Sequence, residues 1–294
     1  DSNAFRLVHA EADLLPALIV DHYGDYFAVQ ALSQGMDRAL PEIVDALVQQ
    51  FAPKGILARN DAAVRAHESL PREIRVLHGE IPESIQLTIN SLLFEVDLQK
   101  GQKTGIFLDQ RENYVAVARY GHGRALDCFT STGGFALHLA SKCNHVEGID
   151  SSAAALVLAE QNRAANLFAN ISFREADGFD LLAGYASAHK KFDIVVLDPP
   201  AFAKSRQQTE GAMRGYREIN LRALRLLGSG GVLVSCSCSH HVSEAAQLET
   251  IAEAALDAGK TLRVLERRTQ GRDHPILLTV PETHYLKCLI LQVV

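Results

Sequence analysis

Two cysteines, Cys236 and Cys238, stand at the end of an apolar run and are followed by the paired histidines His240 and His241. Thiol and imidazole groups can bind zinc, act as nucleophile and base, or lie buried in a core. Zinc-binding cysteine pairs are usually separated by two to four residues, so the single residue between these two disfavours a metal site. A strand would point both thiols to the same side. These residues alone leave packing and nucleophilic catalysis open.

Four aspartates occur where successive apolar runs end: Asp127, Asp150, Asp177 and Asp198. In a doubly wound sheet, ligands bind beyond the carboxyl ends of the strands. Gly133 and Gly134, which follow the first aspartate, let the backbone approach a ligand closely. A single aspartate is often only a helix cap or a turn residue, but four at consecutive strand ends indicate a nucleoside-containing ligand.

The loop after the first of these runs helps to identify the nucleoside. Its sequence, Thr-Ser-Thr-Gly-Gly-Phe at residues 130–135, lacks the G-x-G-x-x-G pattern of nicotinamide and flavin folds. A nearby acid would also repel a pyrophosphate, whereas it suits a ligand with an ammonium group. The pattern therefore favours S-adenosylmethionine as the cofactor over a dinucleotide.

The motif Asp-Pro-Pro-Ala-Phe at residues 198–202 indicates a place for the substrate. Its two prolines fix the backbone and donate no amide hydrogen, so Asp198 and nearby carbonyls are left as acceptors for an amino group or a ring hydrogen. Phe202 could stack on a flat base or serve as a hydrophobic anchor. Both interpretations stay open.

From residue 124 onward, short β-branched runs alternate with amphipathic segments of helical length. This alternation is typical of βαβ units and predicts an α/β fold with a doubly wound, mostly parallel sheet. Two further strand-like runs close the chain and predict an antiparallel hairpin at one sheet edge. The predicted strands are 124–129, 146–150, 171–176, 193–198, 231–237, 261–268 and 285–294, and the predicted helices are 133–143, 152–169, 178–188, 216–228 and 243–259.

The first part of the chain follows a different pattern. A strand at 26–32, a helix at 39–53, a strand at 54–60 and a pair of strands within 84–99 predict a small α+β module. We therefore expect two domains, residues 1–97 and 98–294.

Composition limits the function further. With 47% hydrophobic residues and no apolar run near the roughly 18 residues of a membrane span, we expect a soluble protein. The first residues match neither a signal peptide nor a transit peptide, so we expect a cytoplasmic location. An odd number of cysteines argues against a disulfide framework. The net charge of −6 leaves only a local basic patch, between Lys204 and Arg225, for contact with nucleic acid, and a solvated helix face is the alternative.

Several motifs, in order along the chain, resemble the class I S-adenosylmethionine-dependent 23S ribosomal RNA (cytosine-5-)-methyltransferases. Members of that family carry a PUA domain, an EEHI domain and a catalytic domain, and this sequence begins at the EEHI-like module. The resemblance implies a seven-stranded catalytic sheet. The matching motifs are residues 13–30, 100–114, 126–140, 198–204, 237–241, 273–275 and 285–287.

The resemblance also implies roles for individual residues. The Cys238 thiol would attack C6 of a cytosine, and Asp198 would hydrogen-bond the amino and N3 edge of that base. Asp127 would hold the methionine part of the cofactor, Asp150 the ribose hydroxyls and Asp177 the adenine amino group. The remaining candidates for cofactor binding are Phe129, Thr132, Gly133, Gly134, Gln110 and Arg111, and those for substrate binding are Lys103, Pro199, Pro200, Phe202 and Lys204.

The implied partner is 23S ribosomal RNA or a large-subunit precursor, with no metal and no membrane, and a homodimer is left open. Many RNA 5-methylcytosine enzymes carry a second cysteine in the Asp-Pro-Pro motif, which this chain lacks. Two other functions remain open. One is methylation of an exocyclic amino group, which uses the same motif and needs no thiol, and the other is a non-catalytic RNA-binding scaffold.

Overall fold

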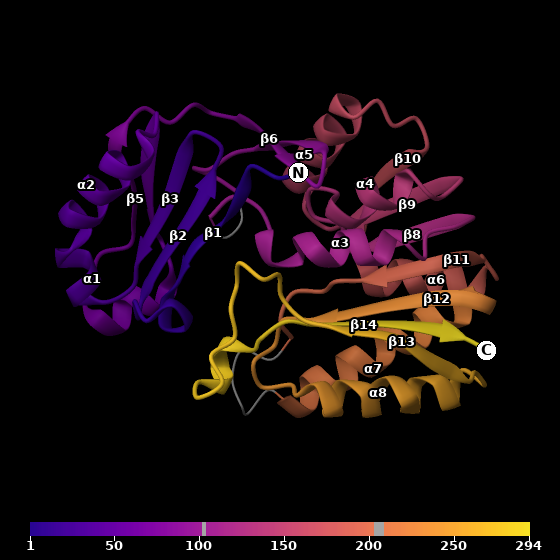
Figure 1. Cartoon of the computed structure of the whole chain (residues 1–294). Helices are drawn as coiled ribbons and strands as arrows, with labels where there is room; N and C mark the ends of the chain where they lie inside the picture. Colours follow the sequence, from indigo (N-terminus) through magenta and orange to yellow (C-terminus); the bar gives the residue numbers. More distant parts are fainter. Residues whose placement is uncertain (102–103, 203–208) are drawn as a thin grey trace. The chain divides into compact units, whose positions relative to one another are not determined.

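The computed structural model describes residues 1–101, 104–202 and 209–294, and it contains two compact units (Figure 1). Unit 1 is Asp1–Arg111 together with Gly271–Thr283, and unit 2 is Glu112–Gln270 together with His284–Val294. This division differs from the predicted boundary between residues 97 and 98.

The residues just after the predicted boundary are packed into unit 1, which explains the difference. The side chain of Thr104 hydrogen-bonds the buried hydroxyl of Tyr23 at 2.9 Å and donates to Asp21. Leu98 and Ile106 are almost fully buried. A segment that the sequence presents as a linker is therefore part of the core of unit 1.

Unit 1 is built on a five-stranded sheet in the order β1-β2-β3-β4-β5, in which only β3 and β4 are parallel. Helix α2 packs Leu40 and Leu47 against Val20, Phe27 and Ile56 of the sheet. Strands β6 and β7 form a separate hairpin. The elements are β1 Ala4–His9, η1 Ala10–Asp13, β2 Leu18–Tyr23, β3 Tyr26–Ala31, α1 Gln34–Arg38, α2 Leu40–Phe51, β4 Gly55–Asn60, η2 Ala63–Glu68, β5 Glu73–Gly79, β6 Ile85–Ile89, β7 Leu92–Val96, η3 Leu108–Gln110 and η5 Pro281–Thr283.

Unit 2 contains a seven-stranded sheet in the order β10-β9-β8-β11-β12-β14-β13. The first five strands are parallel, and β14 runs antiparallel to both β12 and β13. This arrangement confirms the predicted fold class, including the antiparallel pair at one edge. The strands are β8 Arg124–Cys128, β9 His145–Asp150, β10 Ile171–Glu175, β11 Phe192–Leu197, β12 Leu227–Ser237, β13 Leu262–Arg268 and β14 Lys287–Val293.

Helices cover both faces of this sheet. Helices α6, α7 and α8 share one hydrophobic cluster with Leu126, Val195 and Leu233 of the strands, and Figure 1 shows α4 and α5 on the side opposite α7 and α8. Within the described ranges, no helix is long and apolar enough to cross a membrane. The helices are α3 Arg111–Ala118, α4 Gly134–Ala140, α5 Ala153–Ala165, α6 Gly178–Ser187, α7 Thr209–Leu226 and α8 Glu244–Asp257.

Candidate active site at the carboxyl edge of the sheet of unit 2

Asp127 lies at the end of β8 and is fully buried. Its Oδ2 accepts hydrogen bonds from Thr130 Oγ1 at 2.6 Å and from the amide of Ala136 at 3.0 Å. Its Oδ1 is also buried and has no hydrogen-bond partner among the described residues. A buried acceptor without a partner is costly unless a ligand satisfies it, so this oxygen marks a place for a donor from outside the chain.

The pKa of Asp127 is raised to about 7. Burial is the largest cause, because it disfavours the charged carboxylate, and the hydrogen bond from Thr130 opposes it. The negative charges of Asp198 and Asp150 raise the pKa further. The structure therefore places two other predicted aspartates, Asp150 and Asp198, within electrostatic range of Asp127.

The loop after β8 has an unusual backbone. Phe129 and Ser131 have φ values of 65° and 50°, and Gly133 has a φ of 89°. Left-handed conformations at residues other than glycine cost of order 1–3 kcal/mol each and tend to gather at functional sites. Part of this cost is offset because the amide of Ser131 donates to Asp150 Oδ2 at 2.9 Å. The carbonyl of Thr132 accepts a hydrogen bond from the side chain of Asn162.

The next two strands place the other predicted cofactor residues beside this loop. Asp150 ends β9 and also accepts from the amide of Ser152 at 2.9 Å. Asp177 is the N-cap of α6, where its Oδ1 accepts from the amides of Phe179 and Asp180. The ring of Phe129 lies over Gly178, since a Cβ there would be 2.9 Å from the ring. Phe129 thus connects the loop after β8 to the start of α6.

These residues fit S-adenosylmethionine. The buried Asp127 Oδ1 can accept a hydrogen bond from an ammonium group. Two further carboxylates, Asp150 and Asp177, follow the neighbouring strands β9 and β10 and supply acceptors for hydroxyl and amino groups.

The Asp-Pro-Pro-Ala-Phe motif follows β11 directly. Asp198 is half-buried, and its amide donates to the carbonyl of Cys128 at 3.3 Å. Pro199 is buried and Pro200 is exposed. The ring of Phe202 packs against Tyr216 and Phe179, with centroids 4.6 and 5.7 Å apart. Phe202 is thus a hydrophobic anchor in this structure, and its stacking on a base stays a prediction.

Cys238 is the first residue after β12, the strand next to β11. It is half-buried, whereas the other four cysteines of the chain are buried. Cys236 is fully buried and faces Cys288 across the β12–β14 pair, which confirms its interpretation as a small buried neighbour. The two thiols that the sequence could not distinguish therefore have different access to solvent.

Two further residues hold the segment that carries Cys238, and the sequence analysis gave neither of them a role, although Lys287 lies in the matching motif 285–287. The hydroxyl of Tyr216, on α7, accepts from Ser237 Oγ at 3.0 Å and lies 3.1 Å from Ser239 Oγ. Lys287, at the start of β14, donates from Nζ to the carbonyl of Ser239 at 2.7 Å. The position of Lys287, a charged residue at the start of an otherwise apolar strand, is the signal that could have identified it from the sequence.

The paired histidines that follow Cys238 are both exposed. The ring of His240 lies 5.6 Å from that of Tyr285, and the two rings are tilted by 34°. In the part of the chain that the structure describes, no three His, Cys, Asp or Glu side chains are grouped to hold a metal ion.

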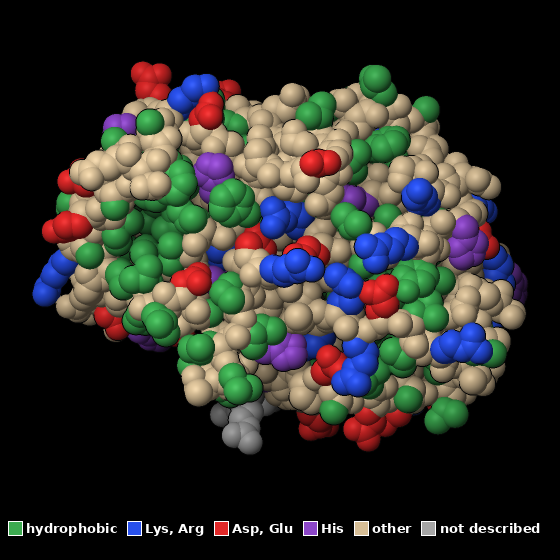
Figure 2. All heavy atoms as spheres, viewed as in Figure 1, with side chains coloured by type: hydrophobic (Ala, Val, Ile, Leu, Met, Phe, Trp, Pro, Cys, Tyr) green, Lys and Arg blue, Asp and Glu red, His purple; other side chains and the backbone are tan. Residues whose placement is uncertain are grey.

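The predicted basic patch is largely neutralised where it is described. On α7, Arg214 pairs with Glu210, Arg222 with Glu218, and Arg217 with an acid of α8. Figure 2 shows Lys and Arg side chains interspersed with Asp and Glu side chains on one face of the molecule. These pairs favour the solvated-helix interpretation. Lys204 and Lys103, both predicted to bind substrate, lie outside the described residues.

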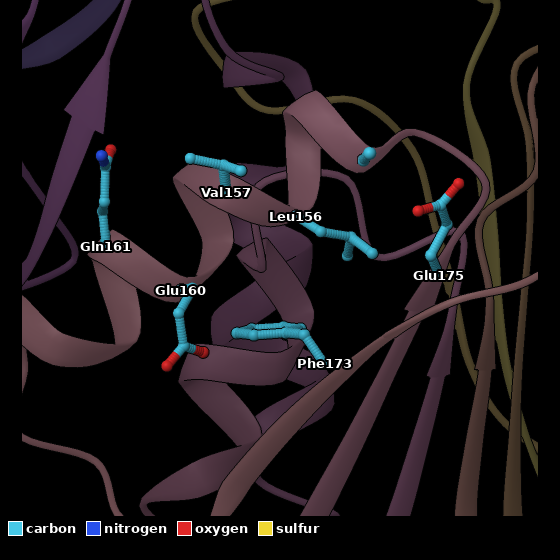
Figure 3. A pocket seen from close by; sticks show the side chains of 7 residues that line it. Leu156, Val157, Glu160, Gln161, Phe173 and Glu175 are labelled. Carbon is cyan, nitrogen blue, oxygen red and sulfur yellow. The ribbon is translucent and has the colours of Figure 1, made fainter.

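An open pocket in unit 2 lies between α5 and β10 (Figure 3). Among the described residues that line this pocket, none is a predicted site residue. The pocket nevertheless lies close to the predicted site, because Glu175, which lines it, stands opposite Asp150 in the register of β10 with β9. The lining residues are Ala153, Leu156, Val157, Glu160, Gln161, Phe173 and Glu175.

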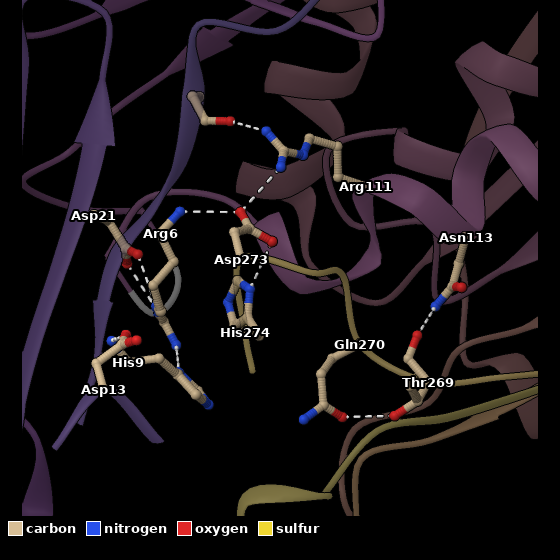
Figure 4. A network of polar contacts seen from close by, with 11 residues as sticks. Arg6, His9, Asp13, Asp21, Arg111, Asn113, Thr269, Gln270, Asp273 and His274 are labelled. Atoms are coloured by element: carbon tan, nitrogen blue, oxygen red, sulfur yellow. Dashed lines mark hydrogen bonds and ion pairs between the residues drawn. The ribbon is translucent and has the colours of Figure 1, made fainter. Parts of the chain in front are cut away.

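Arg111, a predicted cofactor-binding residue, belongs to unit 1, as does Gln110. The Arg111 guanidinium donates to the carbonyl of Ala4 and pairs with Asp273 at 3.1 Å (Figure 4). Asp273 also accepts from the amide of Arg6 and contacts His274 Nδ1. The Asp-His-Pro motif is thus an internal anchor of unit 1, and the cofactor role of Arg111 and Gln110 stays a prediction.

Comparison with known proteins gives consistent matches. A family model described as a methyltransferase domain matches residues 121–277. The ribosomal RNA large subunit methyltransferase I of Tolumonas auensis is 41% identical over 298 residues, which cover 99% of this chain and 75% of that protein. The protein of the same name from Aeromonas salmonicida is 41% identical over 293 residues, which cover 98% of this chain and 74% of that protein.

Solved structures show the same fold. A putative methyltransferase in complex with SAH matches with a TM-score of 0.86 at 22% identity, covering 99% of this chain and 76% of the other. A putative SAM-dependent methyltransferase from Streptococcus mutans matches with a TM-score of 0.85 at 22% identity, covering 99% and 75%.

The seven-stranded sheet, the acidic residues at its carboxyl edge and the domain match define a class I methyltransferase with S-adenosylmethionine as its cofactor. More narrowly, the chain belongs to the ribosomal RNA large subunit methyltransferase I family.

Proposed function

We propose that this protein methylates C5 of a cytosine in the RNA of the large ribosomal subunit, in the cytoplasm, with Cys238 as the nucleophile. The names of the relatives support the class of RNA. The observation that carries the choice of base is Cys238 itself: it alone among the cysteines is accessible, and it follows the strand next to Asp198. Methylation of an amino group requires no thiol at this position.

The chemistry needs a nucleophile because C5 of a neutral cytosine is too weak to accept a methyl group directly. The thiolate of Cys238 forms a bond to C6, and the electrons of the C5=C6 bond become available at C5. S-adenosylmethionine, when bound, supplies an electrophilic methyl group. A base then removes the C5 proton, the C5=C6 bond forms again, and the bond between Sγ and C6 breaks to release the thiolate.

Asp198 has the position to orient the base. It follows β11 and Cys238 follows β12, so both lie at the carboxyl edge of adjacent parallel strands. A carboxylate there accepts from the exocyclic amino group of cytosine. Protonation at N3 would draw electrons from the ring and favour attack at C6, and the negative charge of Asp198 stabilises that form.

We expect the affinity for S-adenosylmethionine to increase as the pH rises toward about 7. The raised pKa of Asp127 means that the carboxyl is protonated below that pH, and only the carboxylate pairs well with an ammonium group. The dissociation constant should therefore rise by roughly tenfold for each pH unit below the pKa. Calorimetry between pH 5.5 and 8 measures this, and Asp127→Asn should bind more weakly with a flat profile. A wild-type affinity independent of pH would contradict the role of Asp127.

The test of the proposed reaction is a covalent trap. In 23S ribosomal RNA that contains 5-fluorocytidine, fluorine replaces the proton that must leave C5, so the enzyme should remain bonded to C6. With the methyl donor present, we expect an RNA–protein adduct that mass spectrometry assigns to Cys238. The Cys236→Ser variant is the control and should form the same adduct.

Three results would overturn the proposal. An adduct at Cys236 would refute the assignment of the nucleophile. Active enzyme that forms no adduct and leaves its methyl group on an exocyclic nitrogen would show an amino-methyltransferase. RNA binding without S-adenosylmethionine binding in calorimetry would show a non-catalytic scaffold.

A further inference from the structure

Lys287 is a buried cation in an apolar strand. Its exposed fraction is 3%, and among the described residues it forms no ion pair with a carboxylate. Its Nζ instead donates to two backbone carbonyls, that of Ser239 at 2.7 Å and that of Tyr285 at 2.9 Å. Burying an ammonium group is costly, and lysine is almost never fully buried without a partner. Its presence here therefore needs an explanation beyond packing.

The two carbonyls fix this ammonium group beside Cys238. Lys287 faces Ser237 in the register of β12 with β14, and Ser239 is the residue after Cys238. The hydrogen bond to Ser239 therefore holds the ammonium group next to the backbone of the residue that follows Cys238, and the charge of Cys238 acts on Lys287. From the other side, Tyr216 holds Ser237 and Ser239 through its hydroxyl. The segment that carries Cys238 is thus held from both α7 and β14.

We propose that Lys287 is the positioning residue that keeps Cys238 in its thiolate form, with the ammonium group placed beside the sulfur by the carbonyls of Ser239 and Tyr285. A cation close to a thiol stabilises the thiolate, which is the nucleophilic form. The thiol proton leaves to solvent and Lys287 keeps its own, so that the ion pair is ready before the substrate arrives. This inference rests on the proposed role of Cys238 as the nucleophile.

The charges around the pair set the pH range in which it operates. The pKa of Lys287 is lowered to about 8 because burial disfavours the ammonium, and the charges of Cys238 and Glu244 oppose that effect. Glu244, at the start of α8, is itself paired with Arg267 of β13. The hydroxyl of Tyr216, on α7, contacts Ser237 and Ser239 on either side of Cys238. Its own pKa is raised, chiefly by burial, so it stays neutral. Lys287 is therefore mostly charged at pH 7 and loses its charge as the pH rises through about 8.

The pKa of the Cys238 thiol tests this inference. Its rate of alkylation by iodoacetamide can be measured from pH 5 to 10 by mass spectrometry of the peptide that contains it, because the other cysteines are buried. In the wild-type protein we expect a thiol pKa below the free value of about 8.5. Lys287→Met removes the charge and keeps an unbranched chain, so it should raise that pKa by about one unit and slow alkylation at pH 7 roughly tenfold.

Two further variants separate charge from structure. Lys287→Arg keeps a cation and should restore most of the alkylation rate. Lys260→Met is the matched control, because Lys260 Nζ also donates to a backbone carbonyl of β12, that of Leu227 at 2.8 Å, at the opposite end of the strand. This control should leave the reactivity of Cys238 unchanged.

The inference fails if Lys287→Met unfolds cooperatively like the wild type and alkylates at the wild-type rate. If that variant does not fold, the thiolate absorbance of the wild-type protein decides, with Cys238→Ser as the blank, and a thiol pKa at or above about 8.5 refutes the inference. The covalent trap separates this result from the proposed function. An adduct at Cys238 without a lowered thiol pKa refutes only the role of Lys287, whereas a lowered pKa without an adduct refutes the proposed reaction.

Discussion

Replacing Cys238 with alanine is expected to abolish methyl transfer to ribosomal RNA, with a loss of roughly a thousandfold or more in rate. Without the sulfur, no bond forms to C6 and C5 keeps the low reactivity of a neutral pyrimidine. Binding of S-adenosylmethionine should remain, because the candidate residues Asp127, Asp150 and Asp177 lie at or just after the ends of β8, β9 and β10, whereas Cys238 follows β12. Transfer of a labelled methyl group measures the first effect, and calorimetry measures the second.

The matched control for this variant is Cys236→Ala. Cys236 is fully buried opposite Cys288, so the substitution removes only a small packed group. We expect it to lower stability modestly and to leave the methylation rate within a few-fold of the wild type. If Cys238→Ala retained full activity, the thiol would have no part in the reaction.

Gly134→Ala is expected to damage both the fold of unit 2 and its cofactor site. A Cβ at this position would lie 2.4 Å from Cζ and 2.5 Å from the hydroxyl oxygen of Tyr114. That ring is buried, with Phe135 and His138 against it at centroid distances of 4.7 and 5.1 Å, so it has little room to move. Overpacking of this kind lowers the free energy of unfolding by about 2–3 kcal/mol.

The displaced loop should also bind S-adenosylmethionine more weakly, by at least roughly tenfold, since loss of one well-placed contact has about that effect. Chemical denaturation and calorimetry measure the two effects. Gly184→Ala is the control, because Gly184 lies inside α6 and a Cβ there meets nothing within 4 Å. Alanine should stabilise that helix by up to about 1 kcal/mol. Equal behaviour of the two variants would refute the steric argument.

The fold of unit 2 could be predicted because its inner strands, among them β11 and β14, are buried and read as short apolar runs between helical patterns. Much of unit 1 could not. Strand β5 is an edge strand whose residues are mostly exposed or half-buried, and β1 is similar, so neither shows a clear alternation of apolar and polar residues. The prediction therefore included β3 and β4 and missed β1 and β5. It also missed β2, which is mostly buried and to which this reason does not apply.

The candidate site was predicted where it depends on strand ends, since Asp127, Asp150 and Asp198 each stand at the carboxyl end of a parallel strand. It could not be predicted where it depends on contacts between distant segments. Lys287 reaches the carbonyl of Ser239, the residue after Cys238, only because β14 lies beside β12, a pairing of strands far apart in the chain. Arg111 forms its ion pair with Asp273, which no local pattern reveals.

The membership of Gly271–Thr283 in unit 1 has a consequence for synthesis of the protein. Asp273 receives hydrogen bonds from Arg6 and Arg111 only after the chain has been extended past β13. At about 5–20 residues per second, the ribosome needs roughly 10 to 30 s to add the residues between Arg111 and this segment. During that interval unit 1 lacks the segment Gly271–Thr283. Its final folding step therefore comes late in translation, and unit 1 cannot complete its folding before most of unit 2 is synthesised.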